Sequence, residues 1–214
     1  MNLVENKLAI LHADAKKDVL RIGKGIAKSI FRPIQPKDFE QAYLPISKKQ
    51  GRVIRDLIIE RNCKNIIEFG TSFGISTIYL ADAARQTGGK VISTELLESK
   101  ANIAKENIED TGLSEYVKIK VGDAMKTLSD YAKPIDFLFL DGWKDLYLPL
   151  FKMLEPQFHA NTIIYADNMD MADTKDYAKY IKTSSHYENQ IIHNGKAFLT
   201  KLSSYSLFNA FSFI

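Results

Sequence analysis

Acidic side chains stand at the ends of two neighbouring apolar runs in the middle of the chain. Glu68 lies in the run Ile66–Phe69, Glu95 ends the next run, and Gly70 and Gly74 lie between them. Glycines let the backbone approach a bound ligand, and a carboxylate about 20 residues beyond such a turn commonly accepts ribose hydroxyls. The two runs and the turn therefore predict the first half of a nucleotide-binding crossover.

The charge at Glu68 discriminates among nucleotide ligands. Glu68, Gly70 and Gly74 give the spacing E-x-G-x-x-x-G, whereas a pyrophosphate-binding turn reads G-x-G-x-x-G. A carboxylate would repel a diphosphate but suits S-adenosylmethionine, which carries a sulfonium and an ammonium group beside its ribose. We expect the turn to hold the amino-acid end of this donor and Glu95 to hold its ribose. A glycine-rich turn without any ligand is the alternative.

Polar side chains follow three further apolar runs, which end at Val121, Leu140 and Ala166. The polar residues concerned are Asp123 with Ala124 beside it, Asp141 and Lys144, and Asp167 and Asn168. Two aspartates and an asparagine at adjacent strand ends supply the oxygen ligands that a hard divalent ion such as Mg²⁺ prefers. Such an ion could hold a hydroxylated acceptor and lower its pKa. Lys144 could then take the proton of that acceptor.

Each of these residues also has an ordinary structural interpretation. Asp141 could cap the following helix, Asp167 and Asn168 could form a turn, and Lys144 could be a solvated surface residue. Their joint placement at one edge of a sheet favours a functional site.

The elements that must position these residues alternate between helix and strand. After the glycine turn we expect a helix that packs back on the first strand. Further helices are expected over 98–111 and 124–131 and in a segment that ends at Leu154, and further strands over 117–121, 135–140 and 163–166. Such alternation requires a mainly parallel sheet with helices on both faces, and ligands bind at the carboxyl ends of its strands. The segments 187–193 and 196–202 flank Asn194-Gly195, which predicts an antiparallel hairpin at one edge of the sheet.

Both ends of the chain are less specific. Residues 1 to about 30 have apolar residues at helical spacing and a basic opposite face, so the predicted helix could lie on an anionic membrane or on RNA, or be a solvated flank that covers a sheet or a partner subunit. Prolines make 31–46 a loop or a short helix, which could form a wall of an acceptor pocket. The apolar residues after 203 are either a tail packed on a neighbouring subunit or a disordered end.

Composition bounds the class of protein. The 214 residues are 45% hydrophobic and 26% charged, with a formal net charge of +3, as in a globular protein with one α/β domain. This charge gives no argument for a nucleic-acid partner. The single cysteine, Cys63, excludes an intramolecular disulfide and fits a reducing compartment. No run suits a membrane span and no signal-peptide core is present, so a cytoplasmic protein is expected.

The motifs together resemble the class I S-adenosylmethionine-dependent methyltransferases, and within them the cation-dependent O-methyltransferases of the catechol and caffeoyl-coenzyme A type. The matching segments are IIEFGTSFGISTIYLA, ISTE, VGDA, FLDGWKDLY and ADN, within about 46–202. The resemblance implies a Rossmann-like seven-stranded sheet with an antiparallel last strand. We also expect the chain to form a homodimer. The resemblance also implies contacts to the methionine part from Glu68, Gly70, Thr71 and Ser76, to the ribose from Glu95 and to the adenine from Asp123 and Ala124. Gly74 and Asp141 would belong to the same cofactor site. The metal ligands would be Asp141, Asp167 and Asn168, and Lys144, with Asp141, would be catalytic.

Two segments depart from this family pattern. Gly142 and Trp143 stand where D-A-D-K is common, and MDMAD replaces an aromatic, glycine-bearing loop. Both would line the acceptor pocket. We therefore expect a methyltransferase domain over 47–203, preceded by a helical cap over 1–46 and followed by a tail over 204–214. Its function would be O-methylation of a small catechol-like or phenolic acceptor, with help from a divalent ion. A metal-independent enzyme that methylates nitrogen, carbon or RNA, and a non-catalytic cofactor-binding module, remain the alternatives.

Overall fold

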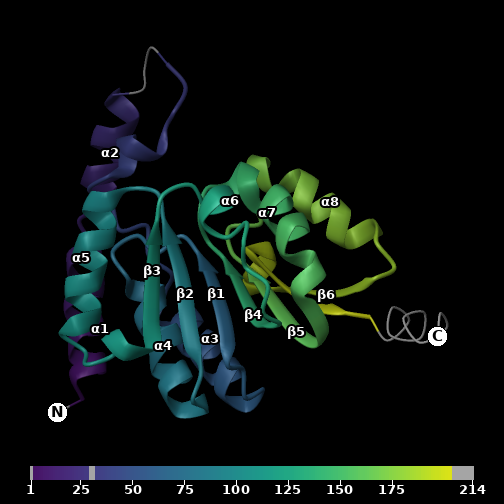
Figure 1. The fold of residues 1–214 in the computed structure, drawn as a ribbon. Coiled ribbons are helices and arrows are strands. Elements are labelled where there is room, and N and C mark those ends of the chain that lie inside the picture. The colour runs from purple at the N-terminus through teal and green to yellow at the C-terminus, as the bar shows by residue number, and fades with distance from the viewer. Residues whose placement is uncertain (1, 29–31, 204–214) are drawn as a thin grey trace.

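A seven-stranded sheet forms the centre of the molecule in a computed structural model that describes residues 2–28 and 32–203 (Figure 1). The strand order is β3-β2-β1-β4-β5-β7-β6. The strands are β1 (Asn65–Phe69), β2 (Lys90–Glu95), β3 (Val117–Val121), β4 (Ile135–Leu140), β5 (Phe158–Ala166), β6 (Tyr187–Ile192) and β7 (Ala197–Leu202). The expected Rossmann-like α/β fold is confirmed.

The direction of the strands brings the predicted site residues to one edge. β1 pairs in parallel with both β2 and β4, and β4 pairs in parallel with β5. β7 is antiparallel to β5 and to β6, as the predicted hairpin requires. β2 and β3 are added on one side of β1, and β4 and β5 on the other side. The crevice for a ligand therefore lies where the strand order reverses, at the carboxyl ends of β1 and β4.

Helices cover both faces of the sheet (Figure 1). One apolar cluster joins the sheet to α1 (Leu3–Ala15), α3 (Lys48–Glu60), α4 (Ile75–Thr87) and the end of α5 (Glu98–Glu109). The other joins it to α6 (Ala124–Thr127), α7 (Tyr147–Leu154) and α8 (Lys175–Thr183). The buried strands explain the apolar runs, because strands covered on both faces have no polar side.

The amino-terminal segment forms two helices where one was predicted. α1 ends at Ala15 and α2 (Asp18–Lys28) begins after a turn at Lys16. The guanidinium of Arg21 donates to the carbonyl oxygen of Asp14 (3.1 Å) and binds its carboxylate (2.6 Å). The same carbonyl oxygen accepts from the backbone N–H of Lys17 (3.0 Å), so Lys17 and Arg21 together stabilise the turn at which α1 ends, and the break is encoded in the local sequence.

Other boundaries differ from those predicted. α6 ends at Thr127 rather than at Tyr131, and β5 begins at Phe158 rather than at Ile163. The hairpin strands stop one residue earlier on each side than predicted, and residues 193–196 connect them. His193 and Asn194 have φ of 50° and 57°, so the turn is a tight helical turn instead of a two-residue loop. Residues 204–214, the predicted tail, lie outside the described part.

Candidate active site

The glycine turn brings β1 against the end of β4. Gly70 follows β1 with φ of 105°, and a Cβ atom there would lie 2.7 Å from the Cα of Gly142. Gly74 begins α4 with φ of 87°. A side chain at Gly70 would therefore push the β1 turn away from the segment that carries Asp141, so this glycine is required by a close backbone approach.

Glu68 is completely buried beneath this turn. The hydroxyls of Thr77 and Ser93 donate to its Oε2 over 2.6 and 2.5 Å. Its Oε1 has no hydrogen-bond partner among the described residues. Burial raises the pKa of Glu68 to about 6, against the lowering effect of the neighbouring hydroxyls. A buried carboxylate oxygen without a donor is costly, and a cationic or N–H-bearing ligand group would satisfy it.

Glu95 is fixed at the carboxyl end of β2. Its Oε2 accepts from the backbone N–H of Ser72 (2.8 Å), and its Oε1 accepts from that of Leu97 (3.0 Å). Each carboxylate oxygen retains a lone pair for a further donor. The carboxylate is thus held in one orientation, as the recognition of a pair of ribose hydroxyls needs.

The remaining predicted donor-site residues have mixed surroundings. Thr71 is buried, and its Oγ1 lies 2.5 Å from the Oγ of Ser93. Ser76 is buried in the first turn of α4. Asp123 caps α6 by accepting from the N–H of Met125 (2.9 Å), and Ala124 is buried behind it. Asp123 therefore has a structural role as a cap, in addition to any contact with a ligand.

A buried lysine that sequence reasoning missed ties the cap loop to the glycine turn. Lys100 Nζ donates to the carbonyl oxygen of Ala42 (2.8 Å) and to Ser72 Oγ (3.3 Å). Ser72 Oγ donates to the carbonyl oxygen of Tyr43 (2.8 Å). Desolvation lowers the pKa of Lys100. Ser72 also holds Glu95, so one network joins residues 42–43 to the predicted ribose acid.

Asp141 and Lys144 form an ion pair at the end of β4. Lys144 Nζ lies 3.2 Å from Asp141 Oδ1 and donates to the phenolic oxygen of Tyr147 (2.9 Å). Only 13% of the Lys144 side chain and 11% of the Asp141 side chain are exposed, so the lysine is not a solvated surface residue. Burial raises the pKa of Asp141 to about 7, although Lys144 opposes the shift. Nor does Asp141 cap a helix, since Trp143 precedes the helical turn 144–146.

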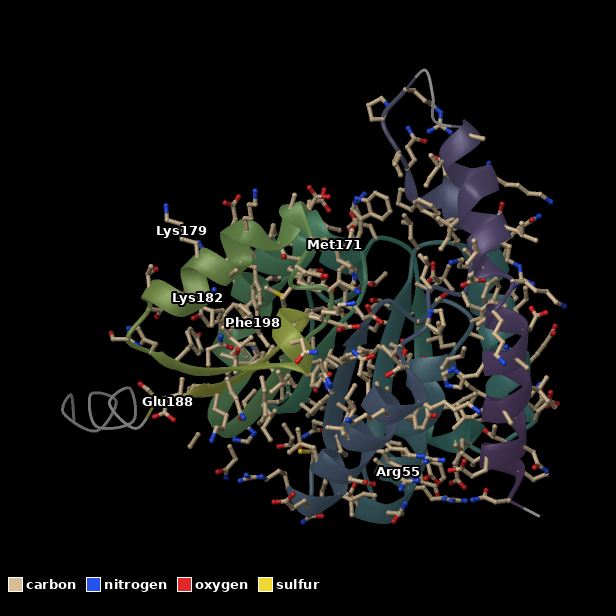
Figure 2. The ribbon with its side chains drawn as sticks, turned by 180° about the vertical axis from the view of Figure 1, so that it is seen from behind. Arg55, Met171, Lys179, Lys182, Glu188 and Phe198 are labelled. Carbon is tan, nitrogen blue, oxygen red and sulfur yellow. The ribbon has the colours of Figure 1, made fainter. Side chains whose placement is uncertain are left out.

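Asp167 and Asn168 lie at the end of the adjacent strand, β5. Asp167 is buried, and Gln50 Nε2 donates to its Oδ1 (3.0 Å). Burial also raises the pKa of Asp167. Asn168 has φ of 56° and begins a turn in which the N–H of Met171 donates to its carbonyl oxygen (3.0 Å). Met171 is nearly half exposed, and Figure 2 shows it in the upper half of the view, with Arg55 near the bottom.

The oxygen atoms at the ends of β4 and β5 are of the kind that a hard divalent cation binds. Lys144 and Gln50 each engage one oxygen of a carboxylate, so the second oxygen of Asp141, that of Asp167 and the Asn168 amide are further donors. Within residues 2–28 and 32–203 no group of three or more His, Cys, Asp and Glu side chains surrounds a common point. Two carboxylates and one amide leave the other coordination positions to water or an acceptor.

The predicted residues therefore form two adjoining groups. Glu68, Gly70, Thr71, Ser76 and Glu95 surround the glycine turn, and Asp141, Lys144 and Asp167 lie beside it across the crevice between β1 and β4. Sequence reasoning also missed Gln50 and Tyr147. Gln50 forms the capping box of α3 with Ser47, which is a common role for glutamine near a helix start. The sequence pattern therefore gave no sign of its contact with Asp167.

Comparison with known proteins gives consistent results. Residues 67–169 match a family described as a methyltransferase domain. Catechol O-methyltransferase of Niastella koreensis is 33% identical over 59% of this chain and 58% of its own length. Catechol O-methyltransferase B of Danio rerio is 28% identical over 67% of this chain and 57% of its own length. The chain therefore spans less than two thirds of either relative.

Solved structures share the fold. An O-methyltransferase from Bacillus cereus, in complex with S-adenosylhomocysteine (SAH), has a TM-score of 0.65 at 24% identity, over 74% of this chain and 83% of that one. A methyltransferase from Podospora anserina, also bound to SAH, has a TM-score of 0.69 at 17% identity, over 94% and 97% of the two chains. The predicted resemblance is confirmed in sequence and in fold.

Proposed function

We propose that this chain is a class I methyltransferase that transfers a methyl group from S-adenosylmethionine to an oxygen of a small hydroxylated acceptor. The match of residues 67–169 to a methyltransferase domain and the fold shared with solved methyltransferases support the proposal. The observation that carries the proposal is the pairing of two sites at one edge. A buried glutamate, one oxygen of which has no hydrogen-bond partner in the described part of the chain, lies beside a fixed carboxylate that suits ribose hydroxyls. The largely buried pair Asp141–Lys144 lies at the same edge of the sheet.

The donor fits the first of these sites. S-adenosylmethionine, when bound, supplies an electrophilic methyl group on a sulfonium. Glu68 would attract the positively charged amino-acid end through its unsatisfied Oε1, and Glu95 would accept the ribose hydroxyls. Gly70, Thr71, Gly74 and Ser76 would form the turn around the methionine part. Asp123, Ala124 and Asp141 would complete the donor site.

The acceptor would be activated by Lys144. In its neutral form, Lys144 Nζ takes the proton of the acceptor hydroxyl while the oxygen attacks the methyl carbon in line with the breaking carbon–sulfur bond. The products are the methyl ether and S-adenosylhomocysteine. The hydroxyl of Tyr147 and the carboxylate of Asp141 hold the lysine in place, so the protein contributes alignment and charge stabilisation.

A divalent cation would be held by Asp141, Asp167 and Asn168. Such an ion would supply Lewis acidity that lowers the pKa of a bound hydroxyl. The ion pair between Lys144 and Asp141 favours the second candidate, a metal-independent methyltransferase, because the lysine already neutralises that carboxylate.

Three features of the wider protein belong to the same proposal. We propose a cap over 1–46, a catalytic domain over 47–203 and a tail over 204–214. The contact of Lys100 with Ala42 supports a cap that closes on the donor turn. We also propose a homodimer, whose mass size-exclusion chromatography with light scattering would measure. A cytoplasmic location is proposed as well, and the single cysteine supports it.

A methyl-transfer assay tests the proposal. The protein would be mixed with methyl-labelled donor and a panel of catechols and phenols, with Mg²⁺ or with a chelator. We expect labelled methyl ether, and a loss of about 100-fold or more in turnover for Lys144→Met. Lys133→Met, an exposed lysine after α6, is the matched control. Turnover by Lys144→Met equal to that of the control would contradict the assigned base, and full activity in chelator would select the metal-independent candidate.

A further inference from the structure

The helix α2 presents its apolar side to solvent. Val19 is 80% exposed and Leu20 is 71% exposed, and Ile26, about two turns further along the helix, is half exposed. At 100° per residue these three positions share one face. Figure 1 shows α2 standing clear of the sheet, past the carboxyl ends of its strands.

The polar side of α2 faces the protein instead. Asp18 is buried, and its Oδ2 accepts from the backbone N–H of Leu44 (2.8 Å). Arg21 binds the carboxylates of Asp14 and Asp18 and stacks 5.2 Å from the ring of Tyr43. These contacts fix the rotation of the helix, so the exposed apolar face is held in place by hydrogen bonds and ion pairs.

Most of the exposed charges around the apolar face are positive. Lys16 and Lys24 are exposed on α2 and its preceding turn, and Lys37 is exposed on the helical turn Pro36–Phe39 (η1) beside it. Asp14 and Asp18 pair with Arg21, and Asp38 pairs with Arg32, whereas Glu40 accepts a hydrogen bond from the neutral hydroxyl of Ser99 and keeps its charge. The three exposed lysines therefore outnumber the one carboxylate of this segment for which the described residues show no ion pair. The outward electrostatic field of the segment is therefore positive.

We propose that α2 lies on an anionic lipid bilayer, with Val19 and Leu20 entering the headgroup region and Lys16, Lys24 and Lys37 facing acidic headgroups. A helix with an apolar face flanked by lysines binds at such an interface. Within the described residues no helix has both the length and the apolarity to cross a bilayer, so the contact is with its surface.

Two other occupants fit the observations less well. A stable contact with a second copy buries about 800 Å² on each partner with 20 to 30 residues a side, far more than one face of an 11-residue helix offers. RNA is bound through arginines and exposed aromatic side chains, but Arg21 and Arg32 are engaged by internal carboxylates and the exposed face of α2 is aliphatic. This inference does not depend on the proposed methyl transfer.

Vesicle sedimentation tests the proposal with the full chain. Vesicles of equal parts phosphatidylcholine and phosphatidylglycerol would be compared with vesicles of phosphatidylcholine alone. We expect binding to the first and at least tenfold weaker binding to the second. The double variant Val19→Glu with Leu20→Glu should lower binding to the anionic vesicles by at least tenfold. Because both side chains are exposed, its thermal unfolding should match that of the wild type.

The matched control carries the same two charges elsewhere. Leu3→Glu with Val53→Glu alters exposed apolar residues on α1 and α3, away from α2, and should leave vesicle binding unchanged. Equal loss in both double variants, equal binding to the two kinds of vesicle, or no binding would each overturn the proposal. Two other results would overturn it as well: a dimer that only the α2 double variant converts to a monomer, or RNA binding that only the α2 double variant abolishes.

Discussion

Replacing Glu68 with glutamine should stabilise the ligand-free protein at neutral pH and weaken its affinity for the methyl donor. The two effects have the same origin, because the carboxylate is buried with one oxygen that lacks a hydrogen-bond donor among the described residues. Glutamine keeps the size of the side chain and removes its charge.

The magnitude follows from the pKa. Burial raises the pKa of Glu68 to about 6 from an ordinary value of 4.5. The folded state therefore binds the proton more tightly than the unfolded state, and the free energy of unfolding falls as pH rises from 4.5 through 6. The difference corresponds to about 2 kcal/mol, which is the cost of the buried charge above about pH 7.

Urea unfolding of wild type and Glu68→Gln across pH 4.5 to 7.5 measures this cost. The neighbouring acids Asp141 and Asp167 titrate in both proteins, so the difference between the two curves reports Glu68 together with its smaller effect on the pKa of Asp141. We expect the variant to gain about 2 kcal/mol relative to wild type between the ends of the range. Calorimetric titration at pH 7.5 should show at least tenfold weaker binding of S-adenosylhomocysteine.

Parallel stability curves would refute the buried, unsatisfied state of this carboxylate. A variant that gains stability and binds the nucleoside with unchanged affinity would refute its role toward the ligand while leaving the electrostatic argument intact.

Two further predictions concern backbone approach and the cap. Gly70→Ala should lower the free energy of unfolding by about 3 kcal/mol or more, because its Cβ atom would lie 2.7 Å from Gly142. Gly88→Ala, with φ of 69° and no atom within 4 Å of the added Cβ, should lower it by about 1 kcal/mol. Chemical unfolding would compare the two variants, and equal losses would contradict the close approach at Gly70. Lys100→Met should cost about 1 to 3 kcal/mol by leaving the Ala42 carbonyl without its donor and should weaken donor binding through Ser72. Lys105→Met, an exposed lysine of α5, is its control in unfolding and titration, and equivalence of the two variants would exclude a link between cap and donor turn.

The sequence was sufficient for the sheet and for the residues at its carboxyl edge. Runs such as Phe137–Leu140 are buried on both faces, so their composition alone indicates strands, and residues that follow parallel strands must meet at one edge. The Glu68 carboxylate could be placed in the same way, since its neighbours in the run are apolar.

The sequence pattern could not predict the tertiary contacts that helix residues make. Lys100 looks like any solvated helical lysine, and only the fold brings it against Ala42 and Ser72. α8 was missed because only Tyr177 and Ile181 are buried in an otherwise polar segment. The sequence could not predict that the apolar face of α2 points outward. Periodicity identifies an apolar face, but it does not tell which side of the helix the rest of the protein covers.

Calorimetric titration of S-adenosylmethionine into wild type and into Glu95→Gln tests the central claim, that the edge formed by β1, β2 and β4 is a methyl-donor site. Glutamine retains one acceptor oxygen but cannot hold both the amide hydrogens of Ser72 and Leu97 and a pair of ribose hydroxyls. We predict saturable binding at one site per chain in the wild type, with affinity at least tenfold weaker in the variant. Absence of binding to the wild type, or equal affinity in the two proteins, would contradict the account.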